Sequence, residues 1–508
     1  MKVNIFTKII LSSALFSVAG GASAAAFQLA EVSSSGLGRA FSGEAAIAEN
    51  ASVVATNPAL MTMFKNKQFS VGGIYVDSRI HLKGKVELGV GSDTNLMQVD
   101  GSNNNVVPGA LVPNLYFVAP INDRFALGAG MNVNFGLKSE YKKDYSAGVF
   151  GGTTELGTVN FNISGAYRVT KGLSFGLGLN AVYAGAKVER TAGILSDVLK
   201  LQDKKIAGRD GRYEQLAKLE KEYEEKVKLL DRITEVERKK DLVAQLESYK
   251  KGIENAHFVI NTAKEVQGKE HVVTRLEDKN AWGFGWNAGL VYEFNERNRV
   301  GLAYHSKVDI DFRDRNALSY APSATKTTEE FIRDHRIAVI GSGGLTLNLP
   351  AYWEISGFHQ LTDRFAVSYS YKYTQWNRFK KLHAKYDDGK EAFSKNENYR
   401  NNSRLGLGVS YDVNDNLRLR AGIAYDEAAA ESHPSASIPD TDRTWFSLGA
   451  TYKITPNLSV DAGFAHLRGK KVNFIEQQFF AGGVANIKAT YQSTAKANLY
   501  GLNLNYSF

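Results

Sequence analysis

Large and small side chains alternate along the last residues of the chain, "LYGLNLNYSF", and this period of two recurs along most of the sequence. Leu502 and Leu504 alternate with Asn503 and Asn505, so an extended segment has one apolar face and one polar face. Related segments, among them "LSFGLGLNAVY", "RLGLGVSYDV" and "TWFSLGATYKI", bring the number of predicted strands to about 14, which is even. Because the small residues are mostly Gly, Asn and Ser, the pattern favours lipid outside and a polar lumen inside.

The connections between these segments alternate between short turns such as "INDR" and "LTDR" and much longer loops. Transmembrane β-barrels of bacterial outer membranes place short turns in the periplasm and long loops outside the cell. The chain ends on Phe508, which resembles the signal by which such barrels are recognised for insertion. We therefore expect an antiparallel outer-membrane barrel that contacts outer-membrane lipids, including lipopolysaccharide, and is inserted by the barrel-assembly machinery.

The first residues predict export, because Lys2 and Lys8 precede a short apolar run and the small residues "ASA". We interpret residues 1–24 as a cleaved signal peptide. No later run approaches the roughly 20 apolar residues that a membrane-spanning helix requires. The chain has no cysteine, which excludes disulfides and thiolate metal sites. Its formal net charge of +9 fits loops near anionic headgroups better than nucleic acid, which an exported chain rarely meets.

One segment, residues 191–278, loses the alternation and becomes densely charged. Leu216, Leu219, Tyr223, Val227 and Leu230 are spaced by three or four, which predicts a helix with an apolar side. The segment forms either one long helix or a helical hairpin with a turn near residues 238–241. It follows the fifth predicted strand on the long-loop side, so we expect a helical extracellular insertion. It either shields the barrel mouth or gives a greasy ligand its first contact.

The stretch "ENASVVATNPALMTMF" keeps neither the helical nor the strand period. Together with the preceding "AAFQLAEVSSSGLGRAFSGEAAIA" it closely resembles the amino-terminal hatch of the FadL-type long-chain fatty-acid transporters of Gram-negative outer membranes. Further resemblances, in the same order along the chain, are "VPNLYFVAPINDRFALGAG", "WGFGWNAGLVYE", "LTLNLPAYWEISG" and "SIPDTDRTWFSLG". They cover nearly the whole mature chain. The charged insertion departs from the family pattern.

The resemblance implies a 14-stranded barrel over residues 68–508 whose lumen is closed by a hatch, residues 25–67. It also implies passive uptake of long-chain fatty acids, which leave sideways at a kink in the third strand, without a cofactor or enzymatic step. Irregular backbone is tolerated inside a lumen. The apolar hatch residues would then close the pore and line a pocket for the acyl tail: Val53, Val54, Leu60, Met61, Met63 and Phe64.

Family positions map onto particular residues here. The hatch motif corresponds to Asn57, Pro58 and Ala59, and the lateral-gate kink to Asn134, Phe135 and Gly136, where Asn and Gly tolerate a bend. The substrate-contacting cations correspond to Arg190 and Lys395, and an acidic residue of the binding pocket to Asp426. Alternation independently predicts that Arg190 and Asp426 point inward, whereas Lys395 lies in a loop-like stretch. All three also fit a role as lumen charges that only stabilise the barrel.

Alternation also places His305, Lys307, Asp309 and Asp311 on one inward face of the seventh strand. A charge ladder explains this spacing better than a metal site, and we expect no metal. Three other functions stay open: uptake of aromatic hydrocarbons, a lipase-type barrel enzyme, for which we find no nucleophile motif, and an adhesin or phage receptor that uses the insertion. Because a closed barrel needs no partner, we expect a monomer.

Overall fold

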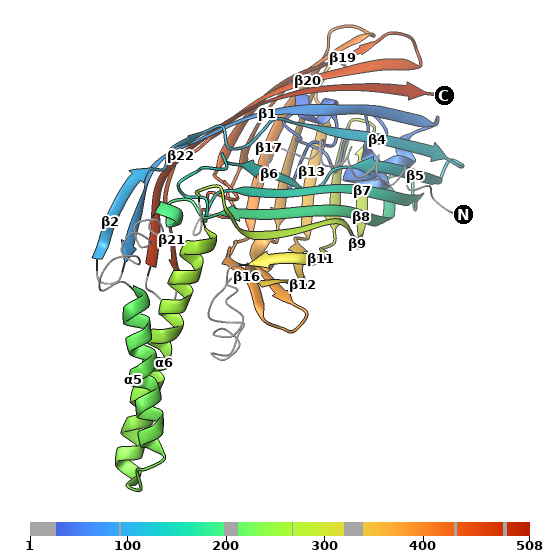
Figure 1. Ribbon diagram of the computed structural model, residues 1–508. Coiled ribbons are helices and arrows are strands. Elements are labelled where there is room, and N and C mark those ends of the chain that lie inside the picture. The colour runs from blue at the N-terminus through green and yellow to red at the C-terminus, as the bar shows by residue number, and fades with distance from the viewer. Residues whose placement is uncertain are drawn as a thin grey trace, which may run out of the picture.

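A computed structural model describes residues 27–90, 93–197, 212–266, 268–319, 339–430, 434–480 and 485–508 (Figure 1). The expected signal peptide, residues 1–24, lies outside the described residues. Within these described ranges, twenty-two strands form one antiparallel sheet that closes on itself. Their bounds are β1 Gln68–Val90, β2 Asp93–Asp100, β3 Asn103–Asn104, β4 Ala110–Pro120, β5 Phe125–Asn132, β6 Gly136–Glu140, β7 Thr153–Arg168, β8 Leu173–Thr191, β9 Val272–Asn295, β10 Asn298–His305, β11 Val308–Ser319, β12 Val339–Leu349, β13 Tyr352–Gln360, β14 Phe365–Thr374, β15 Lys381–Tyr386, β16 Glu391–Asn396, β17 Asn402–Asp412, β18 Leu417–Asp426, β19 Arg443–Lys453, β20 Leu458–Gly469, β21 Val472–Phe480 and β22 Ala485–Ser507.

These strands make fourteen barrel spans, as the sequence predicts. Seven spans are single strands, namely β1, β7, β8, β9, β18, β19 and β22. The other seven are interrupted, namely β2 to β4, β5 with β6, β10 with β11, β12 with β13, β14 with β15, β16 with β17 and β20 with β21. The barrel closes where β1 pairs with β22, from Gln68 opposite Ser507 to Val90 opposite Ala485. No edge of the barrel wall is left open at this closure.

The alternation predicted from the sequence is present on the closing strand. Leu502 and Leu504 are exposed on the outside, whereas Asn503 and Asn505 are buried inside. The same holds across the barrel, where the exposed large side chains include Ile163, Leu179, Leu407 and Leu448. Such a band of apolar side chains on the outer wall is the surface that lipid covers in an outer-membrane barrel.

Residues 27–64 lie inside the barrel and contain three short helices, α2 Ser34–Gly38, α3 Val53–Thr56 and the 3-10 helix η1 Pro58–Met63 (blue in Figure 1), whereas residues 65–67 of the expected hatch are exposed and lead into β1. The side chain of Ser33 caps α2 by accepting a hydrogen bond from the Gly36 N–H. Asn57 caps η1 in the same way, with Pro58 in the first turn. Wall glycines make room for this hatch, since a Cβ at Gly301 would lie 1.7 Å from the Ala45 carbonyl oxygen.

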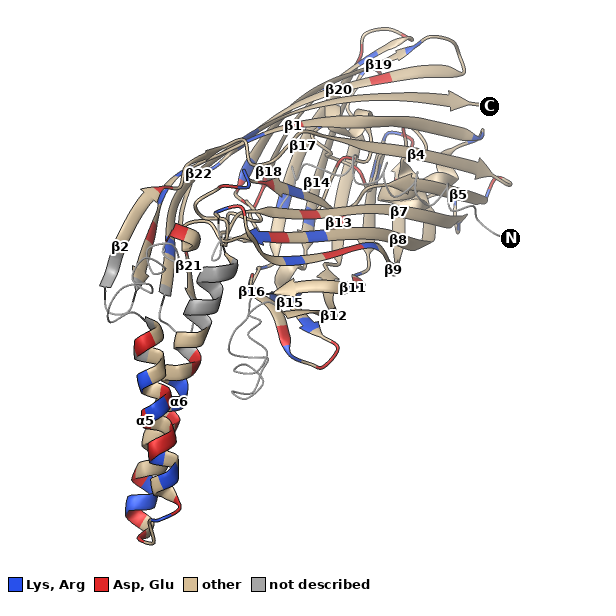
Figure 2. Ribbon diagram, viewed as in Figure 1, with Lys and Arg blue, Asp and Glu red and all other residues tan. Residues whose placement is uncertain are grey.

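The charged insertion is a helical hairpin of α5, Arg212–Leu230, and α6, Val236–Glu265, which projects away from the barrel (Figures 1 and 2). Leu216 of α5 and Ile253 of α6 are buried against each other. The turn spans residues 231–235, a few residues before the expected 238–241, and β9 already begins at Val272. Among the described residues, no helix has the length and apolarity needed to cross a bilayer.

The seventh span corrects one expectation. It is interrupted between β10 and β11, and after the interruption Val308, Ile310 and Phe312 are buried while Asp309 and Asp311 are exposed. The predicted inward ladder is therefore wrong beyond His305, which is buried. Alternation predicts which side chains point inward only while the strand stays regular. After an interruption, the inward and outward positions can exchange.

Candidate functional site

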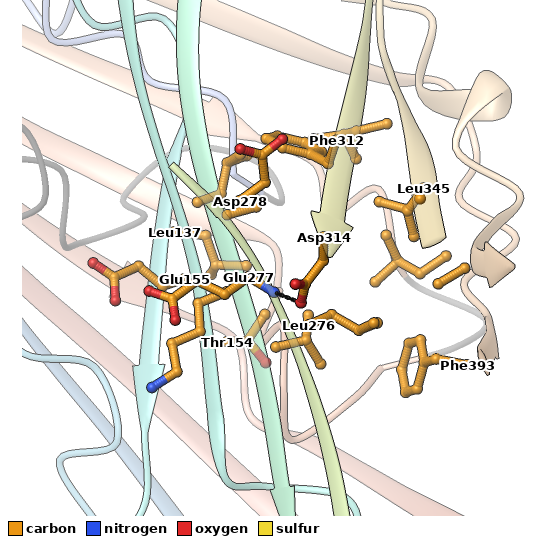
Figure 3. Close-up of a pocket in the computed structure, with 18 of the residues that line it drawn as sticks. Leu137, Thr154, Glu155, Leu276, Glu277, Asp278, Phe312, Asp314, Leu345 and Phe393 are labelled. Atoms are coloured by element: carbon orange, nitrogen blue, oxygen red, sulfur yellow. Dashed lines mark hydrogen bonds between the residues drawn. The ribbon is translucent and has the colours of Figure 1, made fainter. Parts of the chain in front are cut away.

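An apolar chamber lies in the half of the barrel that is nearer the helical hairpin, and it encloses about 730 Å³ of empty space, part of it open to solvent. Its walls come from strands on opposite sides of the barrel (Figure 3). The apolar lining consists of Phe27, Leu137, Leu156, Ala186, Val188, Leu276, Phe312, Leu345, Leu347, Phe379, Leu382, Ala384, Phe393 and Ile438. This lining suits an apolar ligand.

Aromatic rings close the inner end of the chamber around Phe27, the first described residue of the hatch. The ring centroid of Phe27 lies 4.7 Å from that of Trp376, in the short 3-10 helix η2 Trp376–Arg378, and 5.4 Å from that of Phe379. Phe135 lies 6.3 Å from Phe27 and also contacts Trp376 edge-on. These edge-to-face arrangements are the favoured geometry for aromatic pairs. The hatch thus forms one wall of the chamber through Phe27.

The third span is interrupted between β5 and β6, at Val133 to Phe135, which lies one residue earlier than the predicted bend at Asn134, Phe135 and Gly136. The hatch covers the interruption. The Leu29 N–H donates to the Asn134 carbonyl oxygen at 2.8 Å, and the Gly136 N–H donates to the Phe27 carbonyl oxygen at 2.9 Å. The hatch backbone therefore supplies hydrogen bonds that an interrupted strand lacks, and movement of the hatch would expose this stretch of wall.

Arg190 and Lys395 lie next to the chamber and close to the same acidic side chains. Arg190 is buried and donates to the Thr154 hydroxyl at 3.0 Å and to the Thr153 carbonyl oxygen at 2.9 Å. Thr154 also lines the chamber. Alternation thus correctly places Arg190 inside the barrel.

The sequence suggested that Lys395 lies in a loop-like stretch. In the structure it lies in β16. Its ammonium donates to the Ser437 hydroxyl, next to the chamber residue Ile438, and lies 3.6 Å from Glu397 and 3.5 Å from Glu476. The Glu397 and Glu476 carboxylates also interact electrostatically with the Arg190 guanidinium and favour its charged form. Burial raises the pKa of the Glu397 carboxyl, and the Lys395 ammonium offsets only part of this effect. The structure therefore brings the two predicted cations together.

Asp426 belongs to a different cluster. It is buried at the last position of β18, and the nearby cations that favour its charged form are Arg443, Arg404 and Lys372. The hatch carboxyl of Glu31 shares Arg443 and Arg404, and burial raises its pKa to about 7. Asp426 is therefore inside, as alternation predicts, but its neighbours differ from those of Arg190 and Lys395.

The hatch motif is held tightly to the barrel wall. The Asn57 amide donates to the Ala45 carbonyl oxygen at 2.7 Å and to the Leu290 carbonyl oxygen at 3.1 Å, and its side-chain oxygen accepts from the Ala59 N–H at 3.0 Å. Of the predicted pocket residues, Val53, Val54, Leu60 and Met61 are buried in a separate cluster with Tyr116, Val118, Ala126, Ala166 and Val291, against which Met63 and Phe64 also pack. They do not line the chamber.

A buried ion cluster fixes the hatch to β18. Glu49 lies 2.5 Å from Arg39 of the hatch, 3.3 Å from Arg418 and 3.2 Å from Arg420, and Arg39 also pairs with Glu44 at 2.7 Å. Burial raises the pKa of the Glu49 carboxyl, but Arg420, Arg39 and Arg418 together hold it well below its usual range. Sequence reasoning missed Phe27 and this cluster. The isolated charges in an otherwise small and apolar hatch segment were the available signal.

A closed barrel with an apolar outer band, a plugged lumen and an apolar chamber is the architecture of an outer-membrane channel for apolar compounds. The profile of the family described as "Outer membrane protein transport protein (OMPP1/FadL/TodX)" matches residues 15–508. The chain is 55% identical over 512 residues to outer membrane protein P1 of Haemophilus influenzae, with 99% of each chain covered. It is 37% identical over 510 residues to the long-chain fatty acid transport protein of Escherichia coli (strain K12), again with 99% of each covered.

Solved structures show the same fold. A FadL homologue from Pseudomonas aeruginosa is 22% identical and superposes with a TM-score of 0.70 over 95% of this chain and 100% of that one. The toluene transporter TodX of Pseudomonas putida is 16% identical, with a TM-score of 0.56 over 91% of this chain and 95% of that one. The chain therefore belongs to the OMPP1/FadL/TodX family and is an outer-membrane transporter of hydrophobic compounds.

Proposed function

We propose that this protein takes up long-chain fatty acids passively. The acyl tail binds in the chamber, its carboxylate approaches Arg190 and Lys395, and the hatch then moves so that the ligand leaves through the interruption of the third span. The observation that carries the proposal is the position of these two cations beside a chamber whose surface is mostly apolar. A long-chain acid is an apolar tail with one anionic end.

The energetics favour such a ligand. Each methylene group removed from water contributes about 0.8 kcal/mol, so burying eight of them contributes about 6 kcal/mol. A carboxylate removed from water needs a cation or several donors. Arg190 offers a planar fork to a carboxylate, and Lys395 offers a point charge. Glu397 and Glu476 already lie within 3.6 Å of the Lys395 ammonium and also favour the charged form of Arg190, so we expect the substrate carboxylate to compete with them rather than to meet a free charge.

The test is uptake of labelled oleate by cells in which this chain is the only transporter of its family. Arg190→Ala and Lys395→Ala should each lower the apparent affinity for oleate about tenfold, since a charge-assisted hydrogen bond contributes about 1.5 kcal/mol or more. Uptake of methyl oleate, which lacks the charge, should change less than twofold. Lys453→Ala, an exposed lysine at the end of β19, is the matched control. Equal losses for the acid and the ester would contradict the role given to the cations.

Aromatic hydrocarbons are the second candidate ligands. Most of the chamber lining is apolar, and the structural relative TodX is a toluene transporter. Competition settles the choice: toluene that displaces a fluorescent probe from purified protein, where oleate does not, would favour the hydrocarbon. As further parts of the proposal, we expect lipopolysaccharide to surround the apolar band, the barrel-assembly machinery to insert the chain, and the protein to work as a monomer.

A further inference from the structure

The barrel wall contains a second irregular place, between β9 and β11. β9 pairs regularly with β10 up to Asn287 opposite His305, and the last backbone bond runs from the Ser306 N–H to the Trp286 carbonyl oxygen at 2.8 Å. Pairing with β11 resumes only at Arg275 opposite Leu318. Between these points, residues 276–285 and 307–317, all of them described, form no register pair. We call this stretch the seam.

Along the seam, side-chain contacts rather than regular β-pairing hold β9 and β11 together. On the lumen side, Val308 and Ile310 lie over Gly283, where a Cβ would be 2.6 Å from Val308 Cγ1 and 2.9 Å from Ile310 Cγ1. Further along, the Asp314 carboxylate accepts the Glu277 N–H at 2.8 Å. The Asp278 carboxylate accepts the Arg313 N–H at 2.7 Å. Side chains change rotamer without unzipping a strand, so this part of the wall opens at lower cost than a paired one.

The chamber reaches the seam from inside. Leu276, Asp278, Phe312 and Asp314 all line it, and the bond between Glu277 and Asp314 crosses its wall (Figure 3). The seam residues Ala281, Val308 and Ile310 also belong to the same buried apolar cluster as Phe27 and Phe135. A continuous apolar cluster therefore joins the seam to the interruption of the third span, which β7 and β8 separate from β9 along the wall.

The seam begins at the aromatic belt of the outer wall and runs toward the helical hairpin. Trp282 and Phe284 are exposed on the outside, the latter by 72%. The Trp282 ring lies 5.0 Å from that of Tyr183, and the Trp286 ring 5.1 Å from that of Tyr304. Exposed Trp and Tyr mark the membrane–water interface. On the outer wall, Asp309 lies at the level of Gly283 and Lys279 lies further along β9, and both are exposed. The seam thus lies where an amphiphile keeps its polar end.

We propose that the seam is a lateral portal through which a single-chain amphiphile at the outer interface slides its tail into the chamber. An extended acyl chain is about as wide as the spacing between neighbouring strands, roughly 4.8 Å. Separation of β9 from β11 by one strand spacing therefore admits one chain and excludes a diacyl lipid. The inference rests on the proposed function and adds the route by which the ligand arrives.

The test uses the absence of native cysteines. Gly283→Cys with Val308→Cys places two thiols across the seam, near the end at which pairing with β10 stops, where a Cβ at Gly283 would lie 2.6 Å from Val308 Cγ1. In proteoliposomes, oxidation of this variant should slow the initial loading of a fluorescent long-chain acid at least about fivefold, and a reductant should restore it. Thr444→Cys with Arg468→Cys, in the regularly paired wall between β19 and β20, is the control and should not respond.

A second variant covers the case in which the cysteine pair fails to fold. Asp278→Ala with Asp314→Ala removes both carboxylate bonds, and loading should become about threefold faster. Unchanged loading after a verified disulfide, together with unchanged loading in the double alanine variant, would overturn the portal and leave the proposed function standing. If the wild-type protein loads no acid at all, the proposed function fails, and the portal fails with it.

Discussion

Glu49→Gln should release the hatch from the barrel wall. The substitution keeps the shape of the side chain and removes the charge that Arg39, Arg418 and Arg420 share. Arg39 retains Glu44, and Arg418 retains Asp412 at 2.6 Å. The substitution therefore mainly deprives Arg420 of its ion-pair partner, and the Arg420 side chain is only 2% exposed.

The size of the effect follows from that burial. Loss of one partner of a buried ion pair costs about 3–5 kcal/mol, because the other charge stays desolvated. The lower end applies here, since Arg420 still donates to the Thr451 hydroxyl at 2.7 Å. A cost of about 3 kcal/mol raises the population of the undocked hatch about a hundredfold. The barrel ladder is untouched, so the protein should still migrate as a folded barrel in unheated detergent gels.

Cysteine labelling measures this directly. Ser35→Cys introduces the only thiol, at a hatch position that is 3% exposed, and its modification by a soluble maleimide reports hatch opening. The rate should rise by one to two orders of magnitude in Glu49→Gln. Asp412→Asn, which weakens only the outer pair with Arg418, is the control and should change it less than threefold. Equal labelling rates in the wild-type and Glu49→Gln backgrounds would refute the idea that this cluster holds the hatch.

Three further predictions concern the hatch and the hairpin. Asn57→Ala removes three hydrogen bonds of a buried side chain and should destabilise the docked hatch by about 3 kcal/mol, which the same labelling assay detects. A maleimide labelling rate equal to that of the wild type would show that the motif does not anchor the hatch. Gly301→Ala forces a methyl group onto the Ala45 carbonyl and should raise single-channel conductance in planar bilayers, whereas Gly341→Ala, whose nearest contact would be 3.3 Å, should not. Replacement of residues 212–265 by a short Gly/Ser link should leave the barrel folded and oleate uptake within about twofold of wild type, because α5 and α6 pack mainly on each other. Lost uptake would show that the hairpin is the first contact for the ligand. Lost phage or cell binding with preserved uptake would show that it is an adhesive element.

The sequence predicts those parts of the fold that repeat. Fourteen spans, the lipid-facing side of each regular strand and the inward position of Arg190 all follow from alternation, because the pleat fixes which face each residue takes. The same rule fails at Asp309, since the interruption before Val308 depends on how β11 packs over Gly283. No local pattern in "HSKVDIDF" announces that interruption.

The candidate site is less predictable than the fold. The resemblance pointed to Arg190 and Lys395, but their shared neighbours Glu397 and Glu476 come from distant strands and connections. The chamber depends on Phe27, which is one aromatic residue in a segment without a regular period. Contacts of this kind arise only when the barrel has closed, so a single sequence does not disclose them.

The bond between the Ser34 hydroxyl and Asn503, at 2.6 Å, joins residues that are 469 positions apart. The hatch is therefore synthesised before the barrel strands, whereas Asn503 lies in β22, the last of the described strands to be synthesised. Chains with such distant contacts fold slowly, because the loop must close before the contact contributes. Until β22 reaches β1, the hatch lacks this hydrogen-bond partner. The order of synthesis thus makes the plug depend on completion of the final strand, and a chain that lacks β22 loses its pore closure together with its wall.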